Sequence, residues 1–347
     1  MLRLSLTLSL LGSAAWADAP KVVTDISPVT SLVAQVMKGV GEPFQLLPAG
    51  SNPHDHALRP SEAQALDQAN VVFWIGDALS PNLDKAVDTL AGDASVVSLF
   101  DAEGTLHLAS RDSVIFEAHD DHDDHDDHDD HDDHDDHDDH DDHDDHDEEH
   151  HDEDHGDNHH DEDTHEDEHH EAGHGHDHGA DDPHVWLDPE NAKIWLNVIA
   201  ETLATQDTAN ADVYRANAAE GLAMVDQASE TARDLLGAAE GQTFAVLHDA
   251  FQYFESRFDL TALGALSDSD ATSPSPARMA ALRDAITEAG VTCVIAEPQF
   301  DPRLIEALGG TLSVTEVDPL GTELAAGPGL YPELVVETAR RIAGCGQ

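Results

Sequence analysis

The fold is decided by residues 21–28, which are Lys21-Val22-Val23-Thr24-Asp25-Ile26-Ser27-Pro28. The β-branched run favours a buried strand, and the Ser-Pro pair is typical of the first positions of a helix. Apolar residues then recur at helical spacing, at Leu32, Val33, Val36 and Met37. This stretch therefore predicts a strand that passes directly into a helix, which is the repeating unit of a parallel sheet.

The same alternation continues on both sides of a central helical region. Before that region, the sequence predicts strands over 44–47, 71–75 and 94–99 and helices over 60–69 and 83–90. After it, the sequence predicts strands over 244–247, 260–263, 291–296 and 311–317 and helices over 250–257, 277–289, 302–308 and 332–342. The central region predicts helices over 191–205 and 209–236. The simplest architecture is an α/β fold of two doubly wound parallel-sheet lobes joined by a long rigid helix, with a ligand between the lobes.

The N-terminus has the pattern of a secretory signal peptide. A basic residue at Arg3 precedes an apolar run over 4–11, and Ala15-Trp16-Ala17 matches a cleavage site. The apolar run is too short to span a bilayer as a helix. We therefore expect an exported protein with these parts: signal peptide 1–17, N-terminal α/β lobe 18–207 containing a disordered His/Asp-rich insertion 118–182, linker helix 208–238, and C-terminal α/β lobe 239–347.

Most of the formal net charge of −59 comes from that insertion. Between His119 and Asp182 there are 35 acidic residues, 21 histidines and no Lys or Arg. The rest of the chain has 74 − 35 = 39 acidic residues against 15 basic ones. Like charge opposes nucleic acid and anionic lipid as partners, whereas cations are favoured. The tract predicts many weak sites for Zn²⁺ and similar ions, although slippage of a tolerated low-complexity repeat also explains its regularity.

Two cysteines, Cys293 and Cys345, are the only ones in the sequence. In an exported protein such a sparse pair is most simply a disulfide. A metal-binding pair is the alternative, but the spacing does not match a zinc knuckle.

Five histidines lie outside the tract, and three of them occupy the ends of predicted elements. His54 follows the second predicted strand, His184 precedes a helix, and His248 directly follows the buried run 244–247. Asp318 follows the strand over 311–317 in the same way. The ends of strands are where a doubly wound sheet presents functional groups, so these four residues are candidate ligands.

The chain resembles the periplasmic solute-binding proteins of high-affinity zinc ABC importers, the ZnuA type. The resemblance is carried by five motifs in family order: Asn52-Pro53-His54-Asp55, Asp182-Pro183-His184-Val185-Trp186-Leu187-Asp188-Pro189, Leu247-His248-Asp249-Ala250-Phe251, Ala296-Glu297-Pro298-Gln299-Phe300 and Val317-Asp318-Pro319-Leu320-Gly321. It implies a Zn²⁺ site in the interlobe cleft, formed by His54 and His184 from the first lobe and by His248 and Asp318 from the second. Three imidazoles and one carboxylate suit tetrahedral Zn²⁺.

The resemblance also implies roles for the remaining candidates and partners. Glu297 is expected beside the metal ligands rather than on the metal, and His56 is expected as a spare ligand, as a neighbour of the site, or as a solvent-facing residue. Cys293 and Cys345 match a disulfide of zinc-specific members. We expect a monomer in the periplasm of a Gram-negative bacterium, which delivers zinc to an ABC permease and can receive it from a periplasmic zinc chaperone.

Two other functions are considered. A zinc hydrolase is disfavoured, because a fourth protein ligand would close the position that catalytic water needs. A zinc buffer whose active part is the tract is the second alternative. We expect no enzymatic activity.

Overall fold

The computed structural model describes residues 19–111, 113–116, 181–237, 241–267, 274–299, 301–309 and 312–346. The predicted signal peptide, and the predicted insertion up to residue 180, lie outside the described residues.

The first lobe contains a four-stranded parallel sheet with the strand order β2-β1-β3-β4. Its strands are β1 (Val22–Thr24), β2 (Phe44–Gln45), β3 (Val71–Trp74) and β4 (Ser95–Ser98), and the helices between them are α1 (Ser27–Val36), α2 (Pro60–Asp67) and α3 (Pro81–Leu90). The central strands β1 and β3 are buried along their whole length. Their continuous Val and aromatic runs suit strands that are covered on both faces.

The second lobe repeats this arrangement with the strand order β6-β5-β7-β8. Its strands are β5 (Phe244–His248), β6 (Ala262–Ser267), β7 (Cys293–Ala296) and β8 (Ser313–Glu316), and its helices are α6 (Gln252–Arg257), α7 (Pro276–Ala289), α8 (Pro302–Leu308) and α9 (Leu330–Ala343). In each sheet the strand order changes direction between its two central strands. Ligands of doubly wound folds bind at the carboxyl ends of strands beside such a point.

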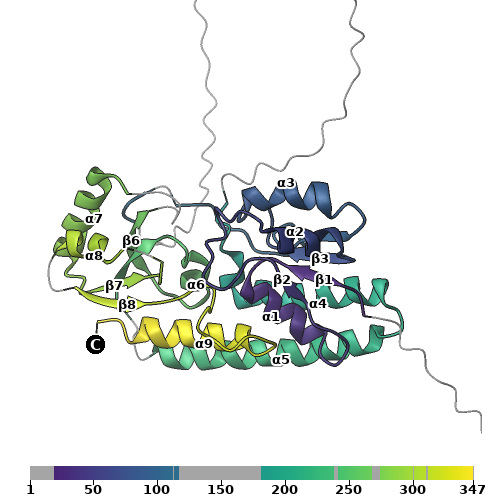
Figure 1. Ribbon diagram of the computed structural model, residues 1–347. Coiled ribbons are helices and arrows are strands. Elements are labelled where there is room, and N and C mark those ends of the chain that lie inside the picture. Colours follow the sequence, from purple (N-terminus) through teal and green to yellow (C-terminus); the bar gives the residue numbers. More distant parts are fainter. Residues whose placement is uncertain are drawn as a thin grey trace, which may run out of the picture. The chain divides into compact units, whose positions relative to one another are not determined.

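Two long helices, α4 (Pro189–Gln206) and α5 (Ala211–Leu236), lie between the two sheets in sequence. Figure 1 shows α5 running alongside α9, and α5 also packs against α1 and α4. It therefore contacts helices of both lobes. The predicted α/β class with two parallel-sheet lobes is confirmed. Among the described helices, none has the length and apolar character needed to cross a bilayer.

The position of one predicted strand is wrong. The sequence predicted a strand over 260–263 that stops before Gly264, whereas β6 continues through this glycine to Ser267. Residues 113–116, which we call the edge segment, pair antiparallel with β6 at this point. Ala265 N donates to Val114 O at 3.0 Å, and a Cβ atom on Gly264 would lie 2.1 Å from that oxygen. The absence of a side chain at position 264 therefore allows the backbone of the edge segment to pair closely with β6, so the glycine lies inside the strand and does not end it.

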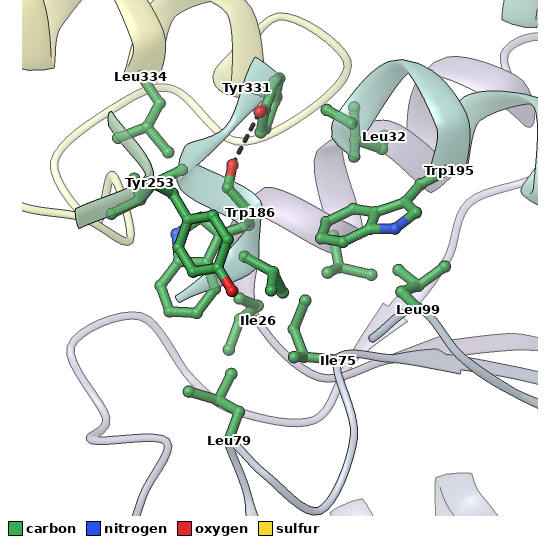
Figure 2. Close-up of a cluster of buried hydrophobic side chains, with 14 of the residues drawn as sticks. Ile26, Leu32, Ile75, Leu79, Leu99, Trp186, Trp195, Tyr253, Tyr331 and Leu334 are labelled. Atoms are coloured by element: carbon green, nitrogen blue, oxygen red, sulfur yellow. Dashed lines mark hydrogen bonds between the residues drawn. The ribbon is translucent and has the colours of Figure 1, made fainter. Parts of the chain in front are cut away.

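Large aromatic side chains join the two lobes around a 3₁₀ turn, η2 (Val185–Leu187). Trp186 Nε1 donates to Pro319 O at 2.8 Å, and Tyr331 Oη donates to Trp186 O at 2.8 Å. Figure 2 shows this second bond as a dashed line among the buried side chains around Trp186. The predicted disulfide between Cys293 and Cys345 is confirmed, and it joins β7 to the end of α9.

Candidate metal centre

Three histidines from distant parts of the sequence meet at the carboxyl end of β5. His54, His184 and His248 each offer one ring nitrogen, and the three nitrogens lie within 4.8 Å of one another. His184 and His248 are buried, whereas His54 is half-buried. Two ligands of one Zn²⁺ ion are at most about 4.2 Å apart, because each Zn–N bond is about 2.1 Å long. Small side-chain adjustments therefore suffice for one ion to bind all three rings.

His248 is the last residue of β5, and a carboxylate orients its ring. Its Nδ1 lies 3.0 Å from Glu297 Oε1, and Glu297 directly follows β7. Gln299 Nε2 donates to the other oxygen of Glu297 at 2.5 Å. When Glu297 accepts a hydrogen bond from Nδ1–H, the lone pair of Nε2 is left for a metal ion.

His184 has the same type of partner, a carboxylate that the sequence pattern did not reveal. Its Nδ1 lies 2.7 Å from Asp182 Oδ1, and the main-chain N of His184 donates to the same oxygen at 2.9 Å. Burial raises the pKa of Asp182 to about 7. In the sequence, Asp182 looks like the last acid of the His/Asp tract. The signal that would have identified it is its place two residues before His184, where an Asp side chain reaches the backbone N–H.

His54 lies in the loop between β2 and α2, and its main-chain N donates to Asn52 Oδ1 at 2.9 Å. Two residues further on, the His56 ring contacts a carboxylate of α2 instead. Its Nε2 lies 3.0 Å from Glu62 Oε2. Glu62 also accepts from the main-chain N of Arg59 at 2.7 Å, which caps the start of α2. His56 therefore braces the loop that carries His54, and it is not a member of the three-histidine group.

Asp318 is not brought into the group, because its carboxylate binds its own loop. Oδ1 accepts from Leu320 N at 2.9 Å, while Oδ2 accepts from Thr322 N at 2.6 Å and from Thr322 Oγ1 at 2.5 Å. It nevertheless lines a pocket together with Asn52, the residue that accepts from His54 N, and with Gln299, the partner of Glu297. Asp318 therefore lies near residues that support two of the three imidazoles.

This chemistry defines a class of protein. Three imidazoles, two of them oriented by buried carboxylates, are a donor set that could hold a borderline metal ion such as Zn²⁺. They are contributed by both lobes of an α/β fold, and His248 stands at the end of a strand, where such folds bind ligands. The chain is thus a two-lobed metal-binding protein.

Similarity to known sequences identifies the family of the chain. The family profile described as "Zinc-uptake complex component A periplasmic" (ZnuA) matches residues 22–345. The high-affinity zinc uptake system protein ZnuA of Brucella abortus (strain 2308) is 41% identical over 336 residues, which cover 96% of this chain and 94% of the relative. The protein of the same name from Paracoccus denitrificans is 40% identical over 341 residues, covering 96% and 95%. The chain belongs to the ZnuA family of periplasmic zinc-uptake components.

Solved structures share the fold at lower identity. A crystal structure of ZnuA aligns with a TM-score of 0.68 at 19% identity, covering 95% of this chain and all of the other. A zinc-bound deletion mutant of ZnuA gives 0.66 at 19% identity, covering 94% and 97%. A manganese-bound periplasmic metal-binding protein from Candidatus Liberibacter asiaticus gives 0.64 at 16% identity, covering 93% and 98%.

Proposed function

We propose that this chain captures Zn²⁺ in the periplasm and delivers it to an ABC importer. The proposed ligands are His54, His184 and His248, with Asp318 as the fourth. The observation that carries the proposal is the convergence of the three imidazoles. Asp318 would exchange a hydrogen bond of its loop for the ion. The whole-chain relationship to high-affinity zinc uptake proteins supports zinc as the cargo.

The site suits binding rather than catalysis. A catalytic zinc keeps a coordination position for water, whereas a fourth protein ligand closes the tetrahedron. Glu297 and Asp182 are each engaged with a ligand imidazole, so they hold these rings with one nitrogen available to the metal. We therefore propose a receptor without enzymatic activity.

Capture and release can be assigned to particular parts of the site. His184 and His248 are buried and oriented by carboxylates, so they form the preorganised half. His54 lies on a half-buried loop, so it would close over the ion last and leave it first. Disturbing this loop on the permease would remove one of the ligands, and the loss of one ligand from a tetrahedral site weakens binding strongly.

The remaining parts of the proposal concern processing and partners. Residues 1–17 would be removed as a signal peptide on export to the Gram-negative periplasm. The mature chain would act as a monomer with the lobe boundaries 18–207 and 239–347 and the linker helix 208–238. Its partners would be the permease and ATPase of the importer, and a periplasmic zinc chaperone would supply the ion.

The test is a metal titration with a competing chelator, comparing the full chain with a variant that lacks residues 119–176. This deletion removes most of the His/Asp tract but keeps Asp182, which the His184 ring needs. The deletion variant is expected to keep one tight Zn²⁺ site and to lose the weaker ones. His248→Ala in the full chain should show the reverse. Loss of the tight site on deletion would contradict the proposal and would favour a zinc buffer whose tract is the active part.

A further inference from the structure

Arg111 makes a fork of hydrogen bonds between two buried carboxylates of the second lobe. Its Nε donates to Asp249 Oδ2 at 2.9 Å, and its Nη2 donates to the other oxygen of Asp249. Its two terminal nitrogens also donate to the two oxygens of Glu255, both at 3.1 Å. The guanidinium carbon lies 3.6 Å from the centre of the Phe116 ring. Four donated bonds and a ring contact give this side chain a single orientation.

The two carboxylates connect Arg111 to the metal centre. Asp249 is the residue after His248, and its main-chain N donates to Ser267 O at 3.2 Å. Glu255 lies in α6, and its Oε2 accepts from Ala262 N at 3.2 Å, which ties α6 to β6. The guanidinium therefore connects Asp249, next to the proposed ligand His248, with strand β6, which Glu255 binds.

The backbone around Arg111 is itself held on both sides. After it, the edge segment pairs with β6, and Phe116 N donates to Leu263 O at 2.9 Å. Before it, Ala109 forms an antiparallel bridge with Asp181, and Asp182 N donates to Leu108 O at 2.8 Å. Asp182 is the residue that orients His184. The same short stretch of chain thus braces the partners of two proposed ligands that come from different lobes.

The positive charge of Arg111 compensates the two buried carboxylates that it binds. Burial opposes the charge of Arg111, but its bonds with Asp249 and Glu255 outweigh this effect and raise the pKa of the guanidinium. Both carboxylates are almost fully buried. Without the guanidinium, two like charges would face each other away from water, so the loop that carries Asp249 would move to restore solvation.

We propose that Arg111 is a positioning residue for metal binding, which fixes the His248 imidazole through Asp249 and slows the loss of the bound ion. The inference rests on the proposed zinc site, although Arg111 is not itself a ligand. It adds to the contacts between the lobes a bridge whose partner, Asp249, is next to a proposed ligand in the sequence.

The test compares Arg111→Met with a matched control, Arg257→Met. Arg257 also bridges the lobes, because its Nε and Nη2 donate to the two oxygens of Asp188, both at 2.7 Å. Its partner is not adjacent in sequence to a proposed ligand. Transfer of Zn²⁺ from the loaded full-length protein to a chromogenic chelator gives the dissociation rate, and absorption of the Co²⁺-loaded protein reports the ligand geometry.

Arg111→Met is expected to lower zinc affinity about 10- to 100-fold, mainly through faster dissociation, and to change the Co²⁺ spectrum. Arg257→Met is expected to lose stability but to keep the Co²⁺ spectrum of the wild type. Should Arg111→Met not fold, Asp249→Asn removes the charged partner next to His248 while keeping the bonds between Arg111 and Glu255, and it should act in the same direction.

The outcomes are distinguishable. A destabilised Arg111→Met, or an Asp249→Asn, with unchanged dissociation rate and Co²⁺ spectrum would show that the fork is only structural, and the inference would be wrong. Absence of a tight site in the wild-type protein would instead contradict the proposed function.

Discussion

Asp318 has two competing uses for one carboxylate. As the proposed fourth ligand it must bind the ion, but both of its oxygens accept bonds from the loop residues Leu320 and Thr322. Asp318→Ala is expected to lower zinc affinity by about 10-fold or more in a chelator competition, because water is a weaker fourth ligand. Thr322→Val removes the hydroxyl bond alone and should change the affinity less than about threefold. Equal losses in both variants would assign Asp318 to the loop rather than to the metal.

The buried carboxyl of Asp25, which is not a proposed ligand, is expected to make the stability of the protein depend on pH. It lies at the carboxyl end of β1, where its two oxygens accept from Ile26 N and Ile75 N, both at 2.7 Å. Burial raises its pKa from 3.8 to about 6. Between about pH 4 and pH 6 the unfolded chain has released this proton while the folded chain keeps it, so the contribution of Asp25 to stability is lost as the pH rises through that window.

The size of this effect is on the order of 2–3 kcal/mol, since one unit of pKa corresponds to about 1.4 kcal/mol. Urea unfolding of zinc-free wild-type and Asp25→Asn protein at several pH values measures it. The free energy of unfolding of the wild type, relative to that of the variant, should fall from pH 4 to pH 6 and then level off. A constant difference would show that the Asp25 carboxyl keeps its ordinary pKa in the folded protein.

At the scale of elements, the pairing of the edge segment with β6 depends on Gly264. Gly264→Ala would place a Cβ atom against Val114 O, so the two strands must separate. The expected cost is about 1–3 kcal/mol in the free energy of unfolding. Faster amide exchange at Phe116 and Ala265, the two donors of this pairing, should accompany it. Gly92→Ala is the matched control, because a Cβ atom there has no neighbour within 4 Å.

The pairing at Gly264 is an example of what could not be predicted from the sequence, in contrast to the central strands. The central strands were predicted correctly because runs such as Val71–Trp74 are buried on both faces and their pattern is local. The edge segment was not predicted, because it pairs through backbone atoms with residues about 150 positions away, and such pairing leaves little trace in the side-chain pattern. The end predicted for β6 was wrong for the same reason.

In the candidate site too, residues within local motifs were predicted and residues that act through long-range contacts were not. The three histidines were recognisable because each stands at the end of an element within a motif, and the structure brings them together. Asp182 and Arg111 were missed: the position of Asp182 two residues before His184 was hidden at the end of an acidic tract, and Arg111 has no local pattern that predicts a role. Their importance comes from contacts across the chain, with His184 in one case and with Asp249 in the other.

At the scale of the molecule, the two lobes are joined by contacts that do not involve the metal. Trp186 N–H donates to Pro319 O, Ser31 Oγ donates to Gly327 O, and α5 packs against helices of both lobes. Such extensive connections favour limited hinge motion and cooperative unfolding. An ion bound by ligands from both lobes should therefore stabilise the whole unit, rather than one lobe alone.

This cooperativity can be measured because the described tryptophans, Trp74, Trp186 and Trp195, all lie in the first lobe. Tryptophan fluorescence therefore follows the first lobe and, through Trp186, its contact with the second lobe, while calorimetry follows the whole protein. With free Zn²⁺ at 100 times its dissociation constant, the folded state gains about 2.7 kcal/mol, so both signals should shift upward together by roughly 5–10 °C. His248→Ala should lose most of this shift, although the mutated residue lies in the other lobe. A calorimetric trace with two transitions, of which zinc moves only one, would show that the lobes unfold independently.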